Sequence, residues 1–164
     1  MLGKRMLMAA AGAAGGGSGF RYLRMDITDV DGGVRIAIGE IEWLVSGTPY
    51  PTSNMTSNTA PSPLVASASS VITEAAWNAF DGATTGMQVD GTAGWLTVDL
   101  GSGNGITPTD ARVTEDTGRG GDKAPKDFTF EGSNTGAFGG EETVFKTVTG
   151  ETGWSDGEVR TYTF

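Results

Sequence analysis

Apolar and polar residues alternate along several short stretches of this 164-residue chain, and such alternation is typical of half-buried β-strands. In the range 21–28, three apolar side chains share one face and three polar side chains share the other: Leu23, Met25 and Ile27 against Tyr22, Arg24 and Asp26. The same period places Leu96, Val98 and Leu100 on the core face of residues 94–100, and Phe128 and Phe130 on that of residues 124–131. We expect these apolar faces to form one core.

Turn and loop signals divide the remaining chain. Further short strands are predicted at 64–70, 143–148 and 159–164, and a helical turn at 75–80. Residues 46–63 carry four prolines among Ser, Thr and Asn, which predicts an irregular loop. About eight short strands separated by turns predict an all-β protein, a jelly-roll β-sandwich.

Two glycine-containing segments in the first third of the chain predict local features of the backbone. Residues 29–33, D-V-D-G-G, predict a hairpin turn, because the fragment lacks the further acidic positions of a calcium loop. The strand that follows places Val34, Ile36 and Ile38 on one face. After Gly39 the apolar positions shift by one residue, to Ile41 and onward, and such a shift at a glycine predicts a β-bulge.

Composition narrows the classes of function. The chain has 27 Gly, no Cys and no His, and its net charge is -9. Without cysteine the chain can form no disulfide and offers no thiolate to a metal. Without histidine it lacks the commonest general base and the usual zinc ligand. The negative charge argues against nucleic-acid binding, which requires clustered Lys and Arg. No apolar stretch reaches the roughly 18 residues of a membrane span.

The first 19 residues are rich in Gly and Ala and include the cations Lys4 and Arg5. Such a segment has little apolar surface to bury, so we expect it to order only against another chain. The alternative is a signal peptide, because two cations precede a short apolar run and small residues. We predict an N-terminal arm at 1–19 and one β-domain at 20–164.

Three segments of the β-domain resemble the discoidin, or coagulation-factor type C, family. W-N-A-F-D-G at 77–82, G-W-L-T-V-D-L-G at 94–101 and K-D-F-T-F-E-G-S-N-T-G at 126–136 are similar to the family pattern A-x-D-G, W-x-x-V-D-L-G and P-x-x-F-x-x-E-x-S-N-D-G. The resemblance covers about residues 20–164. It implies a galactose-binding-like jelly roll and a carbohydrate ligand.

The order of the segments resembles a circular permutation. The segment that closes family members, similar to Y-R-Y-L-R-L-x-I-T, stands first here at 20–28, and the chain stops at 158–164 where the family would run on into it. This layout is similar to that of phage virion proteins, often with a P-K-D-F-T strand like residues 125–129. The resemblance therefore implies a virion structural protein, located in the particle, that forms a homo-oligomer and contacts other virion proteins through its arm.

The same resemblance implies a structural Ca²⁺ site in the loop 78–85. Its ligands would be the carboxylates of Asp81 and Glu40, an oxygen of Thr84 or Thr85, and backbone carbonyls. Calcium takes six to eight oxygen ligands in a flexible shell, which such a loop supplies. The alternative is that Asp81 begins a plain turn and Glu40 is a charge at the rim.

Carbohydrate binding needs exposed aromatic rings beside polar loop residues. Trp154, between Gly153 and Ser155, and Tyr50 are the candidate rings, although each also has a core interpretation. Trp43 is a further candidate ring, whereas the resemblance implies that Trp77 and Trp95 are buried.

Catalysis is not predicted, because the carboxylates Glu40 and Glu42 lie on one strand face rather than across a cleft. We expect a non-enzymatic phage virion or adhesion protein whose module binds a host-surface glycan. The alternative is a free-standing secreted carbohydrate-binding module.

Overall fold

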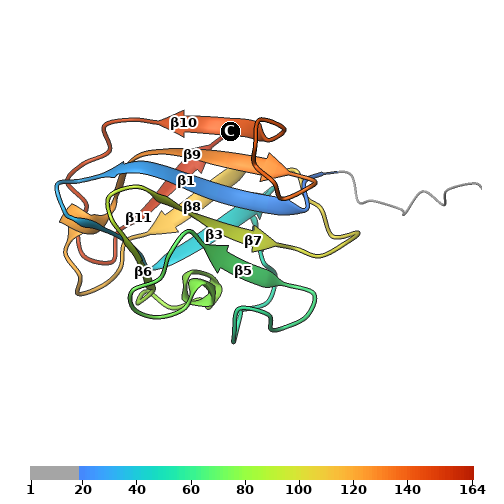
Figure 1. The fold of residues 1–164 in the computed structure, drawn as a ribbon, viewed down its shortest axis with the longest axis horizontal. Helices are drawn as coiled ribbons and strands as arrows, with labels where there is room; N and C mark the ends of the chain where they lie inside the picture. Colours follow the sequence, from blue (N-terminus) through green and yellow to red (C-terminus); the bar gives the residue numbers. More distant parts are fainter. Residues whose placement is uncertain (1–18) are drawn as a thin grey trace, which may run out of the picture.

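The computed structural model describes residues 19–164, which fold into a sandwich of antiparallel β-sheets (Figure 1). The five-stranded sheet has the order β10-β9-β1-β7-β5, the four-stranded sheet the order β11-β8-β3-β4, and β2 pairs with β6 in a small sheet. The strands are β1 (Tyr22–Val30), β2 (Arg35–Ile38), β3 (Glu40–Val45), β4 (Thr48–Tyr50), β5 (Val65–Ala68), β6 (Met87–Asp90), β7 (Gly94–Asp99), β8 (Asp110–Thr114), β9 (Pro125–Ser133), β10 (Thr143–Val148) and β11 (Val159–Thr163). Two 3-10 turns, η1 (Ala76–Phe80) and η2 (Gly121–Lys123), complete the fold. The predicted all-β sandwich is confirmed.

The core lies between the two larger sheets and follows the alternation seen in the sequence. In the centre of the five-stranded sheet, Met25 of β1 stands between Leu96 of β7 and Phe130 of β9. All eight side chains predicted on the core faces are at most 3% exposed: Leu23, Met25, Ile27, Leu96, Val98, Leu100, Phe128 and Phe130. Across the core, Trp43 of β3 meets Phe130 edge-on, with ring centroids 5.5 Å apart.

The two ends of the described domain meet on one aromatic side chain. The ring of Phe145 in β10 lies 5.1 Å from that of Phe20 and 5.3 Å from that of Phe164, between ring centroids. Figure 1 shows the C-terminus beside β10. A circularly permuted strand order requires this closeness, and neighbouring termini make such a reordering tolerable.

The predicted bulge at Gly39 is wrong. β2 ends at Ile38 and β3 begins at Glu40 in a different sheet, so the shift in apolar positions marks the crossing between sheets. Gly39 donates its backbone N–H to Thr114 at 2.8 Å. A Cβ on Gly39 would lie 2.7 Å from the carbonyl oxygen of Thr84 and 2.8 Å from that of Glu115, so glycine is needed for close backbone approach.

The predicted hairpin at residues 29–33 is also wrong, because β1 and β2 belong to different sheets. Val34 is 75% exposed and does not share the buried face of Ile36 and Ile38. Residues 29–33 instead contact a loop that is distant in the sequence: the carboxylate of Asp31 accepts a hydrogen bond from the N–H of Gly153 at 2.6 Å.

Strands β4, β6 and β8 were not predicted from the sequence. β8 lies between β11 and β3 in the four-stranded sheet, yet Ala111 and Val113 are its apolar positions, a weak signal by themselves. Among residues 19–164, the helical turns are too short to cross a bilayer.

Candidate functional site

The loop after η1 is held by a chain of local hydrogen bonds. The Asn78 side chain accepts the N–H of Ala75 at 2.9 Å and donates to Asp81 Oδ2 at 3.1 Å. Asp81 Oδ1 in turn accepts the N–H of Ala83 at 2.8 Å. Gly82 between them has φ +77°, a conformation that favours glycine. The sequence W-N-A-F-D-G-A therefore folds into a turn that fixes the Asp81 carboxylate.

Glu40, at the start of β3, reaches this loop from the four-stranded sheet. Its Oε2 accepts the N–H of Gly82 at 3.1 Å. Glu40 therefore lies beside the loop that contains Asp81, although the two residues are far apart in the sequence. Burial raises the pKa of Glu40 to about 8; the Gly82 N–H opposes the rise, and the nearby Asp81 and Glu42 carboxylates add to it. A cation would favour the ionised form of Glu40.

The threonines of the predicted calcium set are both exposed. Thr84 lines the same cleft as Glu40, and its backbone carbonyl accepts the N–H of Thr117 at 2.9 Å. Thr85 does not line that cleft. Within residues 19–164, no three acidic side chains gather as a metal-binding group. The carboxylates of Glu40 and Asp81 fit Ca²⁺ in ligand type, and threonine and carbonyl oxygens would have to supply the other ligands.

Tyr50 lies at the junction of two clefts, which we call the Tyr50 clefts and which share Tyr50, Pro51 and Thr52. One, of about 220 Å³, extends to the carboxylates Glu40 and Glu42. The other, of about 320 Å³, is walled by prolines and by hydroxyl and amide side chains: Pro51, Pro61, Pro63, Thr52, Ser53, Ser62 and Asn104. The Tyr50 ring packs partly against the core and is half-buried. Of the two predicted sugar-binding rings, the structure places Tyr50 at a cleft.

The other predicted ring, Trp154, is not available to a sugar. Its side chain is 6% exposed, and its Nε1 donates to the carbonyl of Pro125 at 3.2 Å. The Arg160 guanidinium lies 4.1 Å from the ring centroid and covers a face, while Glu151 and Glu158 hold that guanidinium in place. The segment between β10 and β11 thus folds the ring onto β9, and Trp154 is a core residue.

The remaining tryptophans also differ in part from expectation. Trp43 is 1% exposed and belongs to the core. Trp77 and Trp95, which the resemblance placed in the core, are both half-buried. Trp95 precedes the inward-facing Leu96, so the strand period turns its ring to the outer face of the five-stranded sheet.

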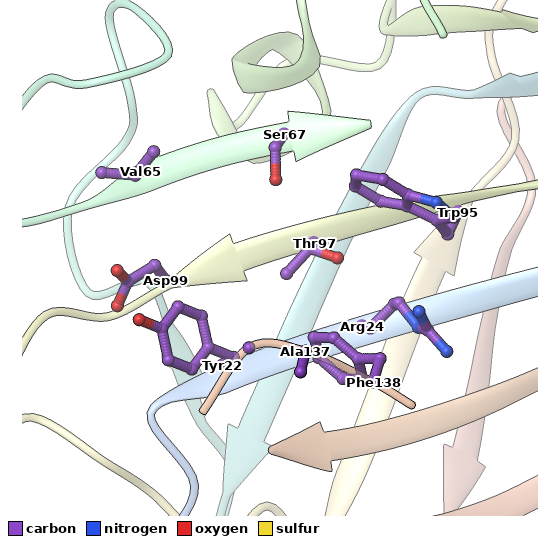
Figure 2. Close-up of a pocket in the computed structure, with 10 residues that line it drawn as sticks. Tyr22, Arg24, Val65, Ser67, Trp95, Thr97, Asp99, Ala137 and Phe138 are labelled. Carbon is purple, nitrogen blue, oxygen red and sulfur yellow. The ribbon is translucent and has the colours of Figure 1, made fainter. Parts of the chain in front are cut away.

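Trp95 belongs to a surface cavity of about 260 Å³ that sequence reasoning missed; we call it the sheet groove (Figure 2). It is lined by outward-facing residues of three neighbouring strands and by a loop: Tyr22 and Arg24 of β1, Trp95, Thr97 and Asp99 of β7, Val65 and Ser67 of β5, and residues 136–138. The alternation in residues 21–28 and 94–100 turns the groove residues of each of these two strands away from the core, and this signal could have suggested an outward-facing site.

Comparison of the chain with protein-family models, with curated proteins and with solved structures found no match in any of the three.

Proposed function

We propose that this protein is a non-enzymatic glycan-binding component of a phage virion, anchored in the particle through its N-terminal arm. The arm lies outside the described residues, apart from Gly19 at its end. The observation that carries the proposal of glycan binding is the position of Tyr50, an aromatic ring between two open clefts with hydroxyl and amide side chains in their walls.

The chemistry of the Tyr50 clefts suits a sugar. The C–H face of a pyranose packs on aromatic and proline surfaces, and its hydroxyls exchange hydrogen bonds with side chains such as Thr52 and Asn104. The Asn104 amide already donates to the carbonyl of Leu100 at 2.9 Å, which fixes the orientation of that side chain. Part of the polar wall is therefore preorganised before a ligand binds.

The acidic side chains beside Tyr50 do not support a hydrolase. Glu40 and Glu42 lie on one strand, and Glu42 is paired with Arg112 at 2.8 Å. A glycosidase places its two carboxylates on either side of the scissile bond, at a separation set by the mechanism. A role in binding therefore explains these residues better than catalysis does.

Glu40 and Asp81 would hold Ca²⁺ in this proposal, together with an oxygen of Thr84. A bound cation would neutralise the facing carboxylates and so stabilise the wall of the cleft. The Asp81 turn itself is closed by Ala83 and Asn78, so the loop keeps its shape through hydrogen bonds of its own.

Glycan binding is tested with the purified full chain on a panel of glycans, followed by calorimetric titration with any glycan that binds. Tyr50→Ala should weaken binding to the Tyr50 clefts at least about tenfold, since a lost ring contact is worth about 1.4 kcal/mol or more. Tyr50→Phe, which keeps the ring, should bind nearly as wild type, and Thr161→Ala on the exposed face of β11 is the matched control. A folded wild-type chain that binds no glycan would refute the proposal.

The virion location needs a separate test. Particles purified by density gradient should contain the chain in stoichiometric amount, detected by mass spectrometry. Recovery of the chain only from the particle-free medium would contradict this part of the proposal and favour a secreted module.

A further inference from the structure

The floor of the sheet groove consists of regular strand positions, so its shape follows from the sheet itself. β1, β7 and β5 are neighbours, and every second residue of each strand faces outward. The inward neighbours, among them Leu23, Leu96 and Val98, are at most 1% exposed and anchor the floor in the core. The groove therefore exists in the absence of a ligand.

The groove is elongated along the strands. Tyr22 pairs with Asp99 across β1 and β7, and Trp95 pairs with Asp26. Tyr22 and Trp95 are thus offset by four strand positions, or about 14 Å at roughly 3.4 Å per residue. Figure 2 shows these two rings at opposite ends, with Thr97 between them. A ligand that contacts both ends must be longer than a single sugar ring.

The charges in the groove are neutralised within the protein. Asp99 forms a bidentate pair with Arg21, with both N–O distances 2.7 Å, and Arg24 pairs with Glu131 at 2.7 Å. The side chains of Arg24 and Asp99 remain 14% and 13% exposed. Each therefore presents polar atoms to a ligand, while its ion-pair partner within the protein balances its charge. Hydroxyl groups of an uncharged ligand match this environment better than a phosphate or carboxylate.

A loop forms one wall of the groove and is held by several hydrogen bonds to one carboxylate. The Glu141 carboxylate oxygen Oε1 accepts hydrogen bonds from Ser133 Oγ at 2.5 Å, from Thr135 Oγ1 at 2.8 Å and from the Phe138 N–H at 3.2 Å. The Phe138 ring is covered by the Arg24 guanidinium, 4.1 Å from its centroid. This wall is formed before binding, which lowers the entropic cost of association.

We propose that the sheet groove binds an uncharged oligosaccharide that lies along the strands. One sugar ring packs on the Trp95 ring. The hydroxyl groups of the next sugar lie opposite Thr97, Ser67 and Asp99, and the far end of the oligosaccharide reaches Tyr22. The Arg21 guanidinium lies 4.7 Å from the centroid of the Tyr22 ring and covers one face of it. Trp95 is therefore the ring on which a sugar stacks, and Tyr22 forms the other end of the groove. The ligand class rests on the proposed glycan binding; the site is separate from the Tyr50 clefts.

The test is calorimetric titration of the full chain with uncharged oligosaccharides of increasing length, chosen from the glycans that bind in the panel. Affinity should rise with length until the groove is filled. Trp95→Ala should lower it at least about tenfold, and Trp95→Phe should restore most of it. Trp77→Ala, at a half-buried tryptophan that does not line the groove, is the matched control and should bind as wild type.

Variants are compared only after circular dichroism and thermal unfolding show a wild-type fold. Glycan binding that Tyr50→Ala abolishes and Trp95→Ala leaves unchanged would overturn the inference while leaving the proposed function intact. Equal affinity for a monosaccharide and for longer chains would also overturn it, because the offset of Tyr22 and Trp95 would then have no role. A folded wild type that binds no glycan would instead refute the proposed function, and the ligand class of the groove with it.

Discussion

Replacing Glu40 with glutamine should make the stability of the protein less dependent on pH. The substitution keeps the size of the side chain and an oxygen that can accept the N–H of Gly82, but removes the charge. In the wild type, burial and the neighbouring carboxylates raise the pKa of Glu40 from 4.5 to about 8. Below pH 4.5 the group is protonated in both the folded and the unfolded state and carries no penalty.

Between pH 4.5 and 8 the unfolded chain ionises Glu40 while the folded protein does not, so stability is lost as pH rises through this window. Each unit of difference in pKa corresponds to about 1.4 kcal/mol, which sets an upper limit of about 5 kcal/mol above pH 8. Residual solvent exposure of the carboxyl lowers the expected effect to about 2–4 kcal/mol. The Glu40→Gln protein should not lose this stability as the pH rises, because glutamine does not ionise.

The assay is urea unfolding of both proteins at pH 5, 7 and 9 in chelator, with the free energy of unfolding obtained by linear extrapolation. Other carboxyls with raised pKa, such as Glu115 and Asp116, contribute to both proteins and cancel in the difference. Added Ca²⁺ should flatten the wild-type profile and leave that of Glu40→Gln unchanged, if Glu40 is a ligand. Parallel profiles of the two proteins in chelator would refute the electrostatic reasoning.

Four further outcomes follow. Chelator should lower the melting temperature of the wild type by several degrees and have no effect on Asp81→Ala, whereas equal melting of the wild type with and without chelator would count against calcium. Phe128→Ala should lower the free energy of unfolding by about 3–5 kcal/mol, measured by urea titration, because the ring is 2% exposed between two sheets. Gly39→Ala should cost about 1–3 kcal/mol in the same assay, since a Cβ meets two backbone carbonyls; an unchanged midpoint would contradict that packing. Deletion of residues 1–15 should leave a folded β-domain, judged by its melting curve, but abolish incorporation into particles; normal incorporation would rule out the arm as the anchor.

The strands of the five-stranded sheet show how far the pattern of residues leads. The alternation in residues 21–28 and 94–100 predicted the core face of each strand, because a strand turns successive side chains to opposite sides. The same period turns Tyr22, Arg24 and Trp95 away from the core, although Trp95 was expected to be buried. The family resemblance indicated a buried Trp95, and the local period was the better guide.

Trp154 and Gly39 are two positions at which the local residue pattern led to a wrong prediction. Glycine and serine neighbours suggested an exposed Trp154, but Arg160 of β11 and the Pro125 carbonyl of β9 enclose its ring. Likewise, Gly39 showed a shift of apolar positions, and only the pairing of β2 and β3 with different partners revealed a change of sheet.

The residue pattern alone predicted the class of fold and the core side of the main strands, and the composition shows a chain without cysteine or histidine. Only the folded structure shows which strands are neighbours, and with this the position of Glu40 beside the Asp81 loop, the burial of Trp154 and the sheet groove. This difference follows from the range over which the interactions act. Alternation and turn preferences act within a few residues, whereas a cleft is formed by side chains that only sheet pairing and packing bring together.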